Sequence, residues 1–160
     1  MSNRIIPQRM TATMEDEFCV FLIGMRINRP LKVHKWFPVF MAMPKMLREL
    51  GAQPELGYLH GHLWLGRTIL MLQYWRSAQH LEDYARNKSL QHVPAWGAFT
   101  RAVGDSGDVG IWHETYQVKA GTYECVYHNM PPFGLGAVGN LIPATGRYQN
   151  AKDRFVAHQQ

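Results

Sequence analysis

The stretch LGYLHGHLWLGRTILMLQYW, residues 56–75, decides the fold of this chain. Residues 56–65 and 68–75 are rich in aromatic and aliphatic side chains, which is typical of β-strands. Gly66-Arg67 joins them, and so short a connection with a glycine at the turn suits a hairpin. We therefore expect two antiparallel strands that lie side by side in a sheet.

A strand and a helix are predicted before this hairpin. The segment EFCVFLIGMRIN, residues 17–28, is apolar on both alternating faces, which indicates a buried strand. Across residues 32–50 apolar side chains recur every three or four positions, as they do along one face of a helix. Pro44 lies inside that helix and lacks the N–H of an interior hydrogen bond, so we expect the helix to bend or break there.

Two helices and two strands are predicted after the hairpin. Ser77 suits the N-cap of a helix that reaches about residue 88, and a further helix is expected over residues 90–103. Residues 109–118 and 122–130 then predict a second hairpin. Without the last strand, the order is that of the ferredoxin-like motif. The predicted fold class is thus α+β: a ferredoxin-like βαββαβ unit with an antiparallel sheet and one added strand.

Composition divides the chain into three parts. Residues 1–16 are polar and have no periodic pattern, so they predict an N-terminal arm. Residues 17–130 hold the ferredoxin-like domain. Residues 131–160 begin with PPFGLGAVGN, which predicts a loop rich in glycine and proline followed by a C-terminal tail.

The predicted sheet is apolar on both faces. In the first strand Phe18 and Val20 point to one side, and Cys19 and Phe21 point to the other. The helices of this motif cover only one face of the sheet, so the second face needs another cover. The simplest cover is the same face of a second copy. We therefore predict a homodimer with its sheets packed face to face, a dimeric α+β barrel.

Charge and hydropathy exclude several classes of partner. The 17 Lys and Arg exceed the 12 Asp and Glu by five, but they are scattered, so we expect no nucleic-acid partner. The longest apolar stretch, residues 18–25, is far too short to cross a bilayer, and residues 1–17 lack the apolar region of a signal peptide. We therefore expect no membrane partner and a cytoplasmic protein.

The aromatic and methionine content indicates a cavity or an interface. Five Trp, seven Tyr, seven Phe and nine Met exceed what the packing of one domain needs, which suits a small apolar organic substrate. His92 lies in such a setting, because Trp96 and Phe99 follow at i+4 and i+7 on the same side. A neutral imidazole among apolar groups suits an axial haem ligand. The alternative is a structural histidine bonded to a backbone carbonyl.

His113 is a second candidate, in the segment VGIWHETYQV. It alternates with Ile111 and Thr115, so these three residues share one strand face, and Glu114 points to the other. If the first face meets the helices, His113 faces His92 across a cavity and can act as a general acid or base. A buried structural histidine is again the alternative.

His60 and His62 alternate in YLHGHLWL and also share a strand face. Two parallel imidazoles can bind Zn or Fe, but a catalytic zinc site takes three protein ligands. His113, Glu114 or His128 would have to supply the third ligand.

A resemblance to known proteins rests on the segments GRTILMLQYWRSAQHLEDYARNKSLQHVPAWGAF, residues 66–99, and GIWHETYQVKAGTYECVYHNMPPFGLG, residues 110–136. Over about residues 17–140 the chain resembles a monooxygenase-like family of the dimeric α+β barrel superfamily. The second segment is also similar to the haem-dependent aldoxime dehydratases. One strand of those enzymes carries a distal histidine before a glutamate, and the next strand ends in Tyr-x-Asn.

The resemblance to the dehydratases implies a role for each candidate. It implies that His113 is the distal acid–base residue, with Glu114 and Thr115 beside it in the catalytic group, and that His92 is the metal ligand of haem b. The pocket around this cofactor would then be built from Trp96, Phe99, Ile111, Asn129, Met130 and Phe133.

The function expected on this basis is that of a haem-dependent, nitrile-forming lyase. Ferrous iron would bind the aldoxime nitrogen, and His113 would protonate the departing hydroxyl group. One alternative is a cofactor-free or haem monooxygenase of the antibiotic-biosynthesis type. In its cofactor-free form an electron-rich substrate fills the pocket and His113 acts as the base. The other alternative is a non-catalytic carrier or sensor of haem or of an apolar ligand, in which His92 matters and His113 is replaceable.

Overall fold

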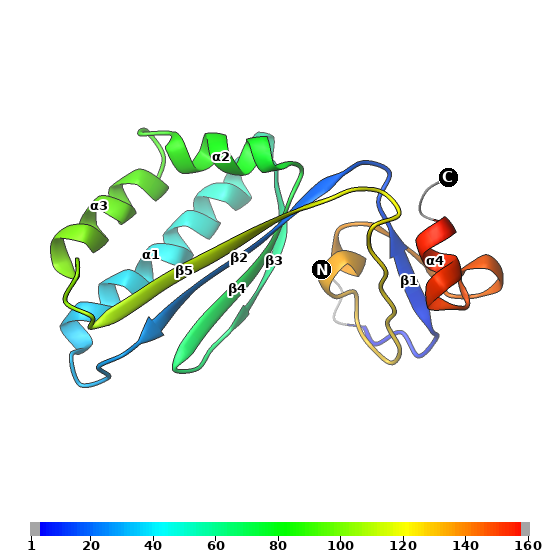
Figure 1. Ribbon diagram of the computed structural model, residues 1–160, viewed down its shortest axis with the longest axis horizontal. Coiled ribbons are helices and arrows are strands. Elements are labelled where there is room, and N and C mark those ends of the chain that lie inside the picture. Colours follow the sequence, from blue (N-terminus) through cyan, green and yellow to red (C-terminus); the bar gives the residue numbers. More distant parts are fainter. Residues whose placement is uncertain (1–3, 158–160) are drawn as a thin grey trace.

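The computed structural model describes residues 4–157 and confirms the α+β class. Four antiparallel strands form one sheet in the spatial order β3-β4-β2-β5 (Figure 1), and they are β2 (Phe18–Ile27), β3 (Tyr58–Trp64), β4 (Thr68–Trp75) and β5 (Val109–Val118). The helices α1 (Val33–Ala52), α2 (Ala78–Arg86) and α3 (His92–Ala102) lie on one face of this sheet. The two middle strands, β2 and β4, are the first and third strands of this sheet along the chain, which is the ferredoxin-like arrangement.

The local expectations around the central hairpin are confirmed with one exception. β3 and β4 pair antiparallel, and Trp64 lies opposite Leu70 next to the short connection. Ser77 caps α2, because its hydroxyl oxygen accepts a hydrogen bond from the N–H of His80 at 3.3 Å. The helix α1 does not break at Pro44, since it runs over 20 residues with Pro44 inside it, and the expected bend there stays a prediction.

The prediction of an added strand is wrong, because residues 122–130 do not extend the main sheet. Their backbone hydrogen bonds go to the N-terminal arm instead. Tyr127 and Met10 exchange two N–H···O bonds of 2.8 and 2.9 Å, and the N–H of Ile6 donates to the carbonyl of Met130 at 3.0 Å. The segment thus pairs through Tyr127 and Met130 with a part of the chain that is distant in the sequence.

The arm and the tail are more ordered than their composition predicts. The strand β1 (Met10–Thr13) lies in the arm and pairs with β6 (Asn140–Pro143) in a second, two-stranded sheet. Two short 3₁₀ helices, η2 (Gly134–Ala137) and η3 (Gly146–Tyr148), and the helix α4 (Ala151–Ala157) complete this part, and a third 3₁₀ helix, η1 (Pro54–Leu56), precedes β3. The first three residues of the predicted arm and the last three of the predicted tail lie outside the described residues.

A buried arginine anchors the C-terminal helix. The side chain of Arg154 is only 2% exposed and forms an ion pair with Glu124. Its Nη1 also donates to the carbonyl oxygens of Tyr148 and Gln149, both at 2.9 Å. Arg154 therefore joins α4 to the segment that was expected to be the added strand.

The second face of the main sheet is covered at one end by the chain itself. Leu135 packs there with Phe18 and Tyr74 in a cluster that extends into β1. The N–H of Gly134 donates to Nε2 of His62 at 3.0 Å. The tail thus supplies part of the cover that was expected from a second copy, and the homodimer stays a prediction.

No helix within residues 4–157 is both long enough and apolar enough to cross a membrane.

Candidate functional site

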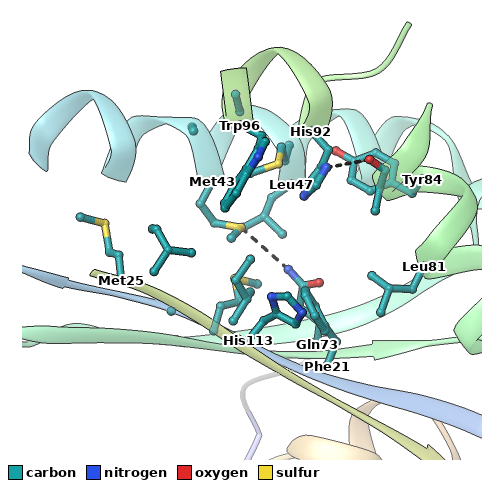
Figure 2. Close-up of a pocket in the computed structure, with 18 of the residues that line it drawn as sticks. Phe21, Met25, Met43, Leu47, Gln73, Leu81, Tyr84, His92, Trp96 and His113 are labelled. Atoms are coloured by element: carbon teal, nitrogen blue, oxygen red, sulfur yellow. Dashed lines mark hydrogen bonds between the residues drawn. The ribbon is translucent and has the colours of Figure 1, made fainter. Parts of the chain in front are cut away.

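An apolar cavity, partly open to solvent, lies between the main sheet and the three helices (Figure 2). Its volume is about 570 Å³, which is within the usual size of small-molecule pockets. Side chains from all three helices and all four strands of the main sheet line it. Glu82 is the only carboxylate among them, and no lysine or arginine contributes to the lining. The cavity therefore suits an uncharged, largely apolar molecule with few polar groups.

Strand pairing places the polar groups on the sheet side of the cavity. Phe21 in the central strand lies opposite Gln73 on one neighbour and opposite Thr115 on the other. Ile23, two residues along, lies opposite His113. Because side chains two residues apart share a face, all five point toward the helices.

His92 reaches the cavity from the helix side, at the first residue of α3. Its Nδ1 lies 2.8 Å from the carbonyl oxygen of Ala85. A carbonyl only accepts, so Nδ1 carries the proton, and a neutral ring then leaves Nε2 as an acceptor. Figure 2 shows the second ring nitrogen turned toward the cavity. The alternative of a histidine bonded to a backbone carbonyl is thus confirmed, and it leaves the other nitrogen available to a ligand.

The junction of α2 and α3, which positions His92, is held by Glu49. One carboxylate oxygen of Glu49 accepts from the hydroxyl of Tyr84 and from the N–H of Gln91, both at 3.0 Å. Burial and the hydrogen bond to Glu49 raise the pKa of Tyr84, so this hydroxyl stays protonated and donates at neutral pH.

His113 lies on the sheet side of the cavity with its ring centroid 5.6 Å from that of Phe21. Its side chain is exposed. Within residues 4–157 no hydrogen bond to another side chain or to the backbone fixes its tautomer, in contrast to His92. His113 is therefore free to accept or donate a proton at either nitrogen.

Gln73 is a site residue that the sequence analysis missed. Its side chain is buried, with 4% exposure, yet it lines the cavity. The indole N–H of Trp75 donates to Oε1 at 2.9 Å, and Nε2 lies 3.8 Å from the sulfur of Met43. A thioether is a weak acceptor, and an unsatisfied buried donor costs about 1–3 kcal/mol. One polar residue in an otherwise apolar strand, ILMLQYW, was the available signal.

The structure brings six of the ten predicted site residues together. The residues that line the cavity are His92, Trp96, Phe99, Ile111, His113 and Thr115. The other four do not line the cavity, and Glu114 lies on the opposite strand face, as the alternation predicted. There its carboxylate accepts from the hydroxyl of Tyr116 at 2.6 Å. Asn129, Met130 and Phe133 leave the sheet with the segment that was expected to be the added strand.

Asn129, Met130 and Phe133 lie away from the cavity. Asn129 is exposed and has a positive φ of 54°, and Met130 bridges to Ile6 in the arm. The ring of Phe133 stacks on His62 on the second sheet face, with centroids 4.0 Å apart. None of the three therefore lines the cavity.

The histidines of β3 do not form a metal site with a third residue. The rings of His60 and His62 lie 4.6 Å apart, and burial lowers the pKa of both. Among the described residues, no group of three or more His, Cys, Asp or Glu could hold a metal ion. His62 instead accepts the N–H of Gly134, which fixes the tail on the sheet.

The residues of the cavity fit haem b only in part. The bonded Nδ1 of His92 is the arrangement that metal-ligating histidines usually have. However, no lysine or arginine lines the cavity to meet the two haem propionates, and an unpaired buried carboxylate is costly. Half of the predicted cofactor pocket also lies elsewhere. The cavity as a whole does not fit an enclosed haem b.

The sheet order, the helix layer and the cavity between them define a ferredoxin-like α+β domain with an apolar site. The sequence model of the Monooxygenase af470-like family matches residues 18–135, which include every strand and helix around the cavity. The chain belongs to this family.

Similar proteins include a curated relative and several solved structures. Monooxygenase af470 of Aspergillus fumigatus is 30% identical over 128 residues, an alignment that covers 73% of this chain and 44% of that protein. The chain thus spans less than half the length of this relative. SnoaB, a cofactor-independent oxygenase from Streptomyces nogalater, is 11% identical with a TM-score of 0.46, covering 65% of this chain and 94% of that one. A conserved protein from Methanosarcina mazei is 11% identical with a TM-score of 0.46, covering 64% and 94%. The comparisons give no support for the resemblance to aldoxime dehydratases.

Proposed function

We propose that this chain is a cofactor-independent monooxygenase that oxygenates a flat, apolar, electron-rich organic molecule. The observation that carries the proposal is the apolar cavity between the sheet and the helices, which has a histidine on each side, in a member of a monooxygenase-like family. This was the alternative to the haem-dependent lyase in the sequence analysis, and it agrees better with a cavity that lacks lysine and arginine.

The absence of a cofactor in this proposal restricts the substrate. The electrons that reduce O₂ must come from the substrate, and a substrate anion gives them up more readily than its conjugate acid. An activated CH₂ group that becomes C=O loses four electrons. One oxygen atom of O₂ becomes the carbonyl oxygen, and the other leaves as water with the two protons of the CH₂ group. This reaction needs a base and no external reductant.

The two histidines and the apolar side chains have separate roles in this proposal. His113 removes the first proton from the substrate, because it lines the cavity and neither of its ring nitrogens is held by another described residue. His92 contacts the substrate from the helix side through Nε2. The apolar side chains of α1 and α3 exclude water from the anion before oxygen reacts.

Oxygen consumption tests the proposal. Anthrone, a flat tricyclic ketone with one activated CH₂ group, is a suitable first probe. We expect one O₂ consumed per molecule of anthraquinone formed, without hydrogen peroxide and without added haem. His113→Ala should lower kcat by about 100-fold or more, the usual effect of losing a general base. His34→Ala, an exposed histidine outside the cavity lining, is the matched control. Equal turnover in His113→Ala would remove His113 from catalysis.

Haem binding by His92 stays a prediction and has a spectroscopic test. Protein expressed with a supply of haem should show no Soret band if the cofactor-independent proposal is right. A stoichiometric band that is lost in His92→Ala, together with activity that depends on haem, would refute it. A band without any turnover would favour the carrier or sensor.

We also propose that the uncovered part of the second sheet face packs against a second copy. Trp64 and Tyr116 are 42% and 50% exposed, and both lie on the face that the tail covers only at one end. Sedimentation should give a dimer for the wild-type chain, and Tyr116→Lys should shift it toward the monomer. A wild-type monomer at micromolar concentration would refute the homodimer.

A further inference from the structure

A buried amide in the sheet has one polar end satisfied and the other open to the cavity. Gln73 lies on β4, in the row of side chains that also contains Phe21 and Thr115. The indole of Trp75 can only donate, so the atom of Gln73 that faces it at 2.9 Å must be the oxygen. This contact fixes the orientation of the amide, and Nε2 therefore points toward Met43 and the cavity (Figure 2).

The amide nitrogen has two hydrogens and only a weak partner for one of them. Within the described residues its recorded contact is the Met43 sulfur at 3.8 Å. Buried N–H groups are nearly always paired, so an exception of this kind needs an explanation. A ligand in the cavity that carries an oxygen atom would supply the missing acceptor.

We infer that Gln73 is the residue that binds the oxygen of the substrate and stabilises the negative charge that develops on it. The inference rests on the proposed function and names its substrate class: ketones or phenols whose oxygen is conjugated with the reacting carbon. When the base removes a proton from such a molecule, the charge moves to this oxygen. A fixed N–H donor in an apolar site stabilises that anion more than it stabilises the neutral ketone.

The surroundings of Gln73 leave it as the oxygen-binding group. No lysine or arginine lines the cavity, so no cation competes for the oxygen. The one carboxylate in the lining, Glu82, would repel an anion. Thr115 lies on the other side of Phe21, beside the strand position of His113, where the proton is removed. A planar substrate over Phe21 would thus have its oxygen toward Gln73 and its acidic carbon toward His113.

Binding of a titratable probe separates this role from a structural one. The probe is 7-hydroxycoumarin, a flat molecule whose neutral and anionic forms differ in absorbance, and 7-methoxycoumarin is the matched compound that cannot ionise. We expect wild-type protein to lower the pKa of bound 7-hydroxycoumarin below that of the free dye. Gln73→Leu should abolish this shift and weaken binding of the anion by about 10- to 100-fold, the usual effect of losing a hydrogen bond to a charged group.

Two further variants complete the test. Gln73→Glu places a carboxylate where the donor was, so the pKa of bound 7-hydroxycoumarin should rise above that of the free dye. Gln117→Leu makes the same change as Gln73→Leu at an exposed position of β5 outside the cavity lining, and the wild-type shift should remain. Unchanged affinity for 7-methoxycoumarin in Gln73→Leu would confirm that the cavity is intact.

The outcomes distinguish this inference from the proposed function. If Gln73→Leu binds both coumarins as wild-type protein does, with the same pKa shift, the assignment of Gln73 is overturned and the cavity remains a binding site. If the wild-type protein binds neither coumarin, the proposed function fails, and the inference fails with it.

Discussion

Replacing Arg154 by methionine should destabilise the C-terminal part of the chain. Methionine retains an unbranched apolar side chain in place of the methylene groups of arginine but removes the charge and every donor. The loss leaves Glu124 without its cation and two backbone carbonyls without their donor. Breaking a buried ion pair by removing one partner costs about 3–5 kcal/mol. Because Glu124 is 22% exposed and can be partly hydrated, we expect a value near the lower end, about 3 kcal/mol.

Urea denaturation followed by tryptophan fluorescence measures this loss, and a double-mutant cycle identifies its source. Glu124→Gln removes the other charge, so the double variant should lose less than the sum of the two single variants. Hydrogen exchange of the β1 amides should accelerate in Arg154→Met, because that strand pairs with the tail. A loss below about 1 kcal/mol, with additive single variants, would show that Arg154 does not anchor the tail.

Three further predictions concern single sites. Gly24→Ala should cost about 1–3 kcal/mol in a denaturation experiment, because a methyl group there overlaps the carbonyl oxygen of Ile69, and an unchanged midpoint would refute this. The hydrogen bonds from Lys32 hold the pKa of Asp108 in the folded protein below its usual value. The contribution of Asp108 to the free energy of unfolding is therefore complete above about pH 4 and is lost as the pH falls through the folded-state pKa. Asp108→Asn should flatten the dependence of stability on pH in that range. Desolvation lowers the pKa of His62, so the free energy of unfolding should fall as the pH drops from about 7 to about 5, and His62→Gln should remove part of that slope.

The sequence correctly predicted those elements of the fold that depend on patterns among neighbouring residues. The hairpin at Gly66-Arg67, the cap at Ser77 and the apolar period of α1 depend on neighbours within a few residues. The conformation of residues 122–130 depends on pairing with Met10, which is more than a hundred residues away. No local sequence pattern predicts that pairing. Alternation of side chains in this segment is compatible with either partner, so the added strand was a reasonable but wrong expectation.

The candidate site likewise contains residues that local patterns predict and residues that they do not. Residues on one strand face or one helix face, such as His113 with Thr115 and His92 with Trp96, were grouped correctly because periodicity alone places them. Of the four residues that do not line the cavity, Glu114 lies on the strand face where alternation put it, and the other three follow the strand that was wrongly predicted. Gln73 was missed because its importance comes from the contact with Trp75, which decides the direction of the amide. A sequence pattern does not contain that direction.

The pairing of β1 with β6 has a consequence for the order of folding. It joins residues about 130 positions apart, such as Met10 and Pro143, whereas the β3–β4 hairpin closes a loop of a few residues. Long loops lose more chain entropy on closure, and distant contacts form slowly. During synthesis, the sheet and helices around the cavity can assemble while β1 has no partner. The strand β1 must therefore wait until β6 has been synthesised, and until then its edge is open to pairing with other molecules.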